Sequence, residues 1–446
     1  MNQIDESNHV ARKSFWADAP LRTSRRGQFW VTAERVTIEG QAYQRGPMFV
    51  AWEAPEHVTQ PLPIVLVHGG TFQGTEWLDT PDGRPGWAQR LLESGYAVFI
   101  VDRPGHGRSP YHPDVIGPTG PPFPYARAKQ VYFSDDAAAA QTQWPFAEAD
   151  SAAFDAFMAG YGPMPADLAA SQVMDADRLA RLLDRIGPSI VVTHSASGPD
   201  GWLLGDRRPG LVAAIVAIEP MGPPFSATPG IGALDWGLTA APVTFDPPRA
   251  SAAEVRAADP SALRIPALAG LPVAVVTGET SGFAPFGPAI VEFLVNAGAA
   301  AEQLRLTDHG VFGNGHGLIY EKNLPRCGDV RAAEYRGRDV ADAGLLMLAG
   351  EFLGEGDRDR RCDDVDDARA RLTQDIGREQ HLADRPVVRQ HREDDVRPEG
   401  VARRRHHLKA VLVVAGPRAV PCADLMPGLG ERRPAVSWSP WVTPAR

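Results

Sequence analysis

The sequence predicts an α/β fold with an open, mostly parallel sheet that helices cover on both faces. Short apolar, β-branched segments at residues 63–68 and 97–102 have the composition of parallel strands buried on both faces. Such segments alternate with stretches of helical periodicity, and turns of small residues follow several of them. Because ligands bind at the carboxyl ends of strands in a sheet of this kind, we expect the chemistry at these turns.

The predicted elements follow one another in a regular order. Residues 28–38 and 48–53 alternate between apolar and polar side chains, which predicts an antiparallel entry hairpin before the first parallel strand. The later elements are a helix at 86–94, a strand at 97–102, a helix at 175–185, a strand at 189–193, a helix at 198–205, strands at 211–218 and 272–277, a helix at 288–297 and a strand at 303–307. We therefore expect one large α/β domain that carries insertions.

Composition and charge limit the kinds of molecule and cell compartment that we expect for this chain. The chain has 446 residues and a net charge of −10, and no basic stripe precedes residue 325, which argues against nucleic acid as a partner. The first 15 residues lack the apolar segment of a secretory signal, and no apolar run approaches the roughly 20 residues of a membrane-spanning helix. All three cysteines lie in the last third of the chain. We expect a soluble, cytoplasmic protein that has no membrane partner.

Three parts are distinguishable along the chain. Residues 1–24 form a polar N-terminal arm, residues 25–324 form the α/β domain, and residues 325–446 form a tail in which Arg and Asp crowd together and the alternation of strands and helices stops. We expect the tail to be poorly ordered, or to be translated from a shifted frame of a GC-rich gene. Resequencing the gene would distinguish these two interpretations.

An insertion at about residues 110–172 interrupts the α/β pattern. It is rich in Pro and Gly and holds ten aromatic residues, too many for a solvated linker. We interpret it as a cap folded over the strand ends; the alternative is a satellite core with no contact to substrate. A second irregular segment, residues 221–260, is expected to line the other side of the cleft.

The main chemical signal lies at residues 189–198, where a buried strand runs into a turn of small residues and then a helix. This is the context of a nucleophile elbow, whose tight turn needs small side chains two residues before and after the nucleophile. Thr193 and Ser197 occupy those positions in place of the usual glycines. We predict Ser195 as the nucleophile. Ser197 is the rival, set back in the first helical turn, and Ser195 as a mere helix N-cap is the structural alternative.

Two backbone amides are candidates for an oxyanion hole. Gly70 follows the first parallel strand in a His-Gly-Gly turn, and Ala196 follows the nucleophile. We expect His68 in that turn to be structural. We also expect residues 102–109, with His106, to support the sheet rather than to take part in the chemistry.

The general base should be a histidine on the loop that follows the last strand. His316 lies between glycines in residues 312–317, and we predict it as the base because the loop can carry it over Ser195. His309 is the competitor, but it stands at the strand end, where its reach is poorer. Two glutamates at strand ends, Glu219 and Glu279, are candidates for the acid that orients the base, and both satisfy the chain order Ser, acid, His.

Several motifs taken together resemble a small group of bacterial α/β-hydrolase esterases with a Ser-His-Glu triad. They are His68-Gly-Gly, Pro81-Asp-Gly-Arg-Pro-Gly-Trp87, Thr193-His-Ser-Ala-Ser-Gly198, Ile218-Glu-Pro-Met-Gly-Pro-Pro-Phe225 and Gly313-Asn-Gly-His316. The resemblance covers roughly residues 25–324. It implies the α/β-hydrolase fold and implies Glu219 as the acid, with Glu279 as second choice. In that group an amphipathic helix follows the position of Lys322, and this sequence departs from the pattern there.

The predicted function is hydrolysis of a small, apolar carboxylic ester through an acyl-enzyme. We expect no metal, because the histidines form no ligand cluster of the H-x-x-H type, and no organic cofactor. Two alternatives stay open. The same fold serves lactonases and cofactor-free lyases, and a non-catalytic ligand-binding module would keep the pocket without the reaction.

Overall fold

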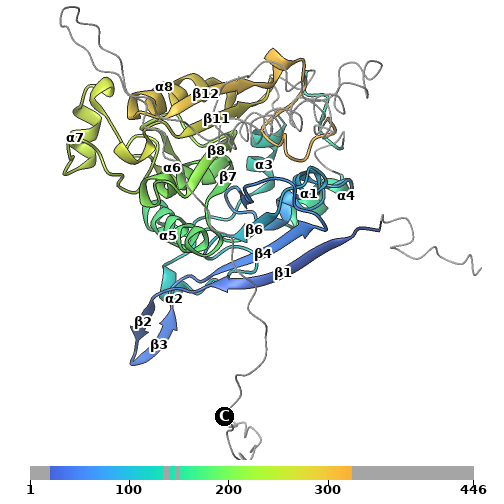
Figure 1. The fold of residues 1–446 in the computed structure, drawn as a ribbon, viewed down its shortest axis with the longest axis horizontal. Coiled ribbons are helices and arrows are strands. Elements are labelled where there is room, and N and C mark those ends of the chain that lie inside the picture. Colours follow the sequence, from blue (N-terminus) through green and yellow to red (C-terminus); the bar gives the residue numbers. More distant parts are fainter. Residues whose placement is uncertain (1–20, 134–139, 147–150, 324–446) are drawn as a thin grey trace, which may run out of the picture. The chain divides into compact units, whose positions relative to one another are not determined.

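A computed structural model describes residues 21–133, 140–146 and 151–323. Its central feature is an eight-stranded sheet with the order β1-β4-β6-β5-β7-β8-β11-β12 (Figure 1). The strands β4, β6 and β1 pair antiparallel, and all remaining pairs from β6 to β12 are parallel. The bounds are β1 Ser24–Val31, β4 Met48–Pro55, β5 Ile64–Val67, β6 Val98–Asp102, β7 Ser189–His194, β8 Val212–Ile218, β11 Pro272–Thr277 and β12 Ala300–Arg305. The predicted α/β class with a mostly parallel sheet is confirmed.

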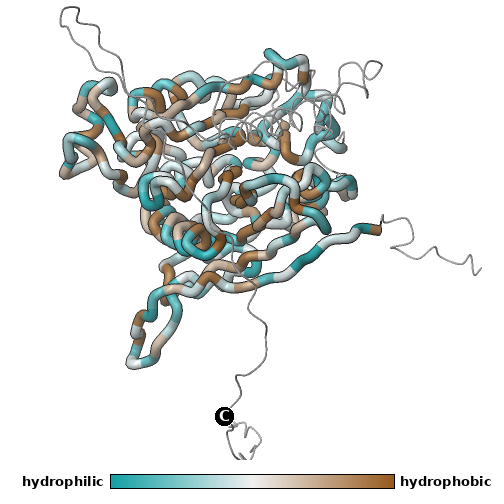
Figure 2. Tube along the Cα trace, viewed as in Figure 1, coloured by the Kyte–Doolittle hydropathy of each residue, from teal (hydrophilic) through white to brown (hydrophobic). Residues whose placement is uncertain are grey.

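Successive side chains of each central strand point to opposite faces of the sheet, and each face is covered by a hydrophobic core. In β5, Val65 and Val67 belong to one core, which includes buried side chains of α5 (Leu168–Ile186), α6 (Gly198–Arg207) and α8 (Gly287–Ala297). Ile64 and Leu66 belong to the other core, with α1 (Trp87–Glu93) and aromatic residues of the insertion. Figure 2 shows apolar residues gathered in the central strands.

Shorter elements connect these parts. They are the 3-10 helices η1 Gly74–Trp77, η3 Ser195–Ser197, η4 Pro260–Ala262, η5 Pro266–Leu268, η6 Ala284–Phe286 and η7 Leu306–His309, the helix α7 Ala252–Ala257, and the two-stranded pair β9 Ala227–Thr228 and β10 Gly232–Ala233. The pair β9 and β10 lies within the second irregular segment, residues 221–260.

The entry hairpin differs from the prediction. The strands β1 and β4 do pair antiparallel, but residues 35–38 form a separate strand, β2 (Arg35–Ile38), which pairs with β3 (Gln41–Gln44). Glu39 and Gly40 connect β2 to β3 with φ of 50° and 79°, the left-handed pair that a two-residue hairpin turn requires. This small hairpin projects from the sheet (Figure 1).

Two further boundaries were predicted wrongly. The helix α5 begins at Leu168, seven residues before the predicted start, where the carboxylate of Asp167 accepts the N–H of Ala170 as an N-cap. The insertion therefore ends at Asp167 rather than at about residue 172. The strand β12 runs over Ala300–Arg305, not 303–307, because the chain turns into η7 at Leu306.

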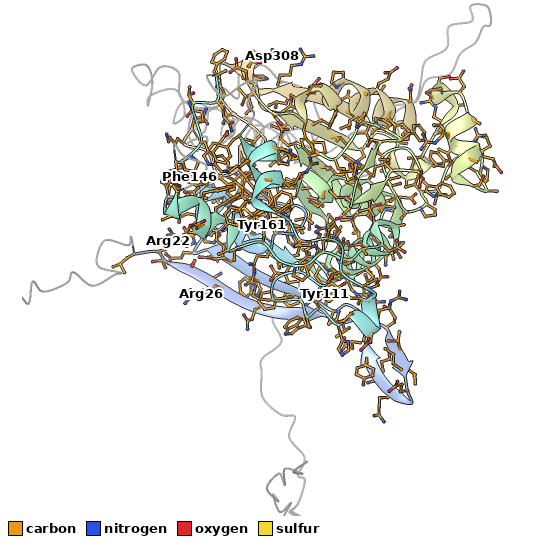
Figure 3. All side chains as sticks on the ribbon, turned by 180° about the vertical axis from the view of Figure 1, so that it is seen from behind. Arg22, Arg26, Tyr111, Phe146, Tyr161 and Asp308 are labelled. Atoms are coloured by element: carbon orange, nitrogen blue, oxygen red, sulfur yellow. The ribbon has the colours of Figure 1, made fainter. Side chains whose placement is uncertain are left out.

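The insertion between β6 and α5 contains α2 (Pro113–Ile116), α3 (Tyr125–Tyr132) and α4 (Ala152–Met158). Its aromatic rings form a contiguous cluster, with centroids 5.4 Å apart for Tyr132 and Trp144 and 5.6 Å apart for Trp144 and Phe157. Phe146 and Tyr161 lie within the dense side-chain packing of this region (Figure 3). The cluster is part of the core on the α1 side of the sheet. Nearly all of the predicted N-terminal arm and the predicted tail lie outside the described residues.

Candidate active site

Ser195 stands at a strained turn between β7 and α6. Its φ is +55°, a left-handed conformation that non-glycine residues adopt at a cost of about 1–3 kcal/mol. Ser197, two residues on, is fully buried, and its hydroxyl lies 3.0 Å from the carbonyl oxygen of Val67 and 3.0 Å from the N–H of His194. The rival serine thus braces the turn, while Ser195 is only partly buried and lines a cavity.

Gly198 explains how the turn works without the usual pair of glycines. A Cβ atom on Gly198 would lie 2.7 Å from the Cβ of Pro220, too close for any side chain. The start of α6 therefore packs directly against the chain that follows β8. The close approach that the elbow requires is met one residue later than in G-x-S-x-G.

His316 is the histidine that the structure brings to Ser195. Its Nε2 lies 3.0 Å from the Oγ of Ser195, and its ring stacks on Phe283 with centroids 4.0 Å apart. The base loop, residues 313–317, is held by carboxylates at two points. Glu321 accepts the N–H of Gly315 at 2.9 Å, and Glu279 accepts the N–H of Gly313 at 2.8 Å. His309 is exposed at the end of η7 and does not line the cavity.

The two candidate acids have different surroundings. Glu219 directly follows β8 with φ of +48°, and its Oε2 lies 3.7 Å from Nδ1 of His316. Its carboxylate also accepts the N–H of Gly278 and the hydroxyl of Ser281, both at 2.5 Å. Glu279 instead bonds the base loop at Gly313. The geometry therefore favours Glu219 for contact with the imidazole and gives Glu279 a loop-holding contact.

Burial shapes the electrostatics of this pair. It raises the pKa of Glu219 to about 8, against the opposing effect of hydrogen bonds from Gly278 and Ser281. Burial also lowers the pKa of His316 well below its ordinary value, and the electrostatic interaction with the neighbouring His194 ring lowers it further. At neutral pH the resting imidazole is therefore neutral and keeps a lone pair for a proton from Ser195.

The raised pKa of Glu219 predicts a specific dependence of stability on pH. In the folded protein the carboxyl group of Glu219 keeps its proton up to about pH 8, whereas in the unfolded chain it loses the proton near pH 4.5. The contribution of Glu219 to the free energy of unfolding is therefore complete at low pH and is lost as pH rises from about 4.5 to about 8. Glu219→Gln removes the titration. We expect the free energy of unfolding of the variant, relative to wild type, to rise between pH 5 and pH 8, measured by denaturant titration. Parallel pH profiles of the two proteins would contradict this.

The two predicted oxyanion donors lie next to each other. A Cβ atom on Gly70 would approach the Cβ of Ala196 to 3.1 Å, and one on Gly69 would approach that of Ser195 to 3.4 Å, so the turn packs closely against the elbow. The N–H of Gly69 is already bonded to Glu76 at 2.9 Å. Gly70 and Ala196 both line the cavity.

The cavity above Ser195 has a volume of about 540 Å³. One wall comes from the insertion and includes Phe123 and Tyr161, and the other follows β8 and includes Met221 and Ile231. Both segments expected beside the cleft therefore line it. Its largely apolar lining is suited to an apolar small molecule.

Some residues of the site were missed from the sequence. Glu76 in η1 accepts the N–H of Gly69, and its Oε1 lies 3.5 Å from Nδ1 of His194, which precedes the nucleophile. Phe283 stacks on His316, and Arg103 contacts the Gly69 carbonyl oxygen. Arg103 lies in the 102–109 segment that was expected only to support the sheet, whereas Glu76 and Phe283 lie outside the predicted motifs. The expected structural role of His68 agrees with its full burial and its bonds to Gly69 and Arg103.

Over the described ranges, no three His, Cys, Asp or Glu side chains are grouped as a metal site. None of the helices in the described part of the chain has the length and apolar composition needed to cross a bilayer.

The family of this chain is shown by its similarity to a fungal protein. The chain is 36% identical over 312 residues to a protein named probable secreted lipase phiG, from Fungal sp., and the match covers 64% of this chain and 84% of the relative. The chain belongs to the α/β-hydrolase superfamily. No family model matches it.

Solved structures also resemble this α/β-hydrolase. A novel bacterial esterase is 22% identical, with 68% of this chain and 92% of that chain covered and a TM-score of 0.48. The esterase Est22 is 16% identical, with 67% and 75% covered and a TM-score of 0.35.

Proposed function

We propose that this chain is a serine hydrolase that cleaves carboxylic esters through an acyl-enzyme intermediate. The observation that carries the proposal is the 3.0 Å contact between Ser195 Oγ and His316 Nε2 at the floor of an apolar cavity. A hydroxyl becomes a strong nucleophile when a neutral imidazole accepts its proton. The name of the fungal relative, a lipase, supports the same reaction class.

The reaction follows from the contacts around Ser195. As Oγ attacks the ester carbonyl, its proton passes to Nε2 of His316, and the amides of Gly70 and Ala196 bind the oxyanion. Glu219 in its ionised form, which is populated as pH rises through its raised pKa of about 8, accepts a hydrogen bond from Nδ1–H of His316 and stabilises the imidazolium; Oε2 and Nδ1 lie 3.7 Å apart in the resting site. His316 then gives the proton to the leaving alcohol. Water attacks the acyl-enzyme through the same base and restores Ser195.

The substrate that fits is a small ester with an apolar group. The described part of the insertion acts as a cap, because Tyr132 lies both in the aromatic cluster and beside the site, with its ring centroid 5.7 Å from that of His316. No cofactor enters the mechanism. The fungal relative is named as a secreted lipase, so the cytoplasmic location expected from the sequence stays a prediction, which cell fractionation tests.

Assays with p-nitrophenyl esters beside lactones test this function. We expect turnover of short- and medium-chain esters with an initial burst of nitrophenol, because the acyl-enzyme forms before it is hydrolysed. Turnover of lactones without turnover of esters would favour the lactonase alternative. A folded protein that binds apolar ligands and turns over neither class would favour the binding module.

A further inference from the structure

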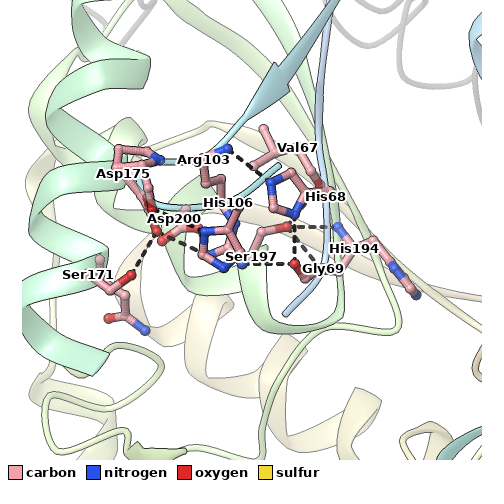
Figure 4. Close-up of polar contacts among 12 residues, drawn as sticks. Val67, His68, Gly69, Arg103, His106, Ser171, Asp175, His194, Ser197 and Asp200 are labelled. Atoms are coloured by element: carbon pink, nitrogen blue, oxygen red, sulfur yellow. Dashed lines mark hydrogen bonds and ion pairs between the residues drawn. The ribbon is translucent and has the colours of Figure 1, made fainter. Parts of the chain in front are cut away.

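The peptide between Gly69 and Gly70 is clamped on its carbonyl side. The guanidinium of Arg103 donates to the carbonyl oxygen of Gly69 at 2.8 Å, and Nδ1 of His68 lies 2.8 Å from the same oxygen (Figure 4). The backbone N–H of Arg103 donates to Nε2 of His68 at 2.9 Å. Since Nε2 accepts, the proton of the neutral ring is on Nδ1, and His68 donates to Gly69 as well.

This clamp fixes the direction of the neighbouring amide. A trans peptide is planar, and its C=O and N–H bonds point in opposite directions. The carbonyl of Gly69 and the N–H of Gly70 belong to one such unit. When Arg103 and His68 hold the oxygen on the buried side, the N–H of Gly70 must point the other way, toward the cavity that Gly70 lines.

Arg103 is itself held in place by the main helices. Its guanidinium lies 3.0 Å from Asp175 in α5 and 3.4 Å from Asp200 in α6, and both carboxylates are fully buried. Burial raises the pKa of both, that of Asp175 to about 6. Ser171 lies beside Asp175, 3.4 Å away. A charged group fixed from two helices is a rigid support for a turn that lacks side chains.

We propose that Arg103 is a positioning residue of the oxyanion hole. Its charge-assisted bond to the Gly69 carbonyl sets the plane of the peptide that carries the Gly70 donor, and it polarises that N–H toward a substrate oxyanion. Arg103 does not touch the substrate. The inference rests on the proposed ester hydrolysis and on Gly70 as one of its donors.

Arg103→Met tests this role, with Arg178→Met as the matched control. Arg178 is also buried and donates to backbone carbonyls, those of Gly46 and Arg45, but away from the cavity. We expect Arg103→Met to lower kcat by about 10- to 100-fold with KM within about twofold, because an oxyanion donor acts mainly in the transition state. The inhibition constant of a trifluoromethyl ketone should rise by the same factor. Arg178→Met should lose thermal stability and keep kcat.

A second pair of variants tests the clamp on the Gly69 carbonyl oxygen even where Arg103→Met does not fold. His68→Asn can place its amide N–H near the position of Nδ1, whereas His68→Gln places its amide near the position of Nε2, where the carbonyl oxygen can accept from Arg103 N–H. We expect His68→Asn to retain more kcat and to bind the trifluoromethyl ketone more tightly. Equal losses in the two His68 variants would overturn the inference, as would a folded Arg103→Met with kcat and inhibition like Arg178→Met. Absence of ester hydrolysis in wild type would instead overturn the proposed function, and this inference with it.

Discussion

Replacing Ser195 by alanine is expected to lower kcat for a p-nitrophenyl ester by about 10⁴- to 10⁶-fold, with little change in KM. The variant loses the only nucleophile that we assign to the 3.0 Å contact with His316, while the cavity that binds the ester stays the same. Residual hydrolysis should come from the oxyanion donors acting on water. Steady-state kinetics over a range of substrate concentrations separates the two parameters.

Ser197→Ala is the matched control for this prediction. The Ser197 hydroxyl bonds the carbonyl of Val67 and braces the elbow, so its loss should lower the melting temperature more than it lowers kcat. A second control, Ser226→Ala, removes a buried hydroxyl that lines the same cavity. If Ser195→Ala kept activity close to either control, Ser195 would not be the nucleophile.

Above about pH 8, where Glu219 is ionised, Glu219→Gln is expected to lower kcat by about 10⁴-fold, the loss that follows when an amide replaces the carboxylate behind a catalytic histidine. The amide cannot balance an imidazolium, and its NH₂ group would face the Nδ1–H of His316 or force the other tautomer. Within the described part of the chain Nδ1 forms no hydrogen bond in the resting site, and Oε2 of Glu219 lies 3.7 Å from it. Kinetics at several pH values measures the loss.

Glu279→Gln separates the two candidate acids. Glu279 accepts one N–H, that of Gly313, and a glutamine oxygen can accept the same bond, so kcat should fall by less than about tenfold. A large loss at Glu279 with a small loss at Glu219 would reverse the assignment.

Much of the fold was predictable because buried parallel strands have a continuous apolar composition. The strand β11 was placed at its observed bounds, and β7 within one residue of them. The edge strand β12 was misplaced because, of its six residues, Leu304 alone is buried, which leaves little apolar pattern to detect. The start of α5 was hidden because its first turns continue the irregular composition of the insertion.

The site was predictable only in part. Ser195 and His316 were predicted from their positions after strands, where the topology limits the choices. The sequence alone could not choose between Glu219 and Glu279, because each follows a strand at the same edge of the sheet, and which side chain meets the imidazole depends on the turn after the strand. Glu76 was not detectable, since its bond to Tyr320 joins residues 244 positions apart.

The pairing of Ser195 with His316 is tested most directly by mapping the site of covalent labelling by a fluorophosphonate, which reacts with an activated serine hydroxyl. Intact mass and peptide sequencing should show one adduct, on Ser195, absent in Ser195→Ala and present in Ser197→Ala. An adduct on another serine, or none in folded wild-type protein, would contradict the claim that Ser195 and His316 form the reactive pair.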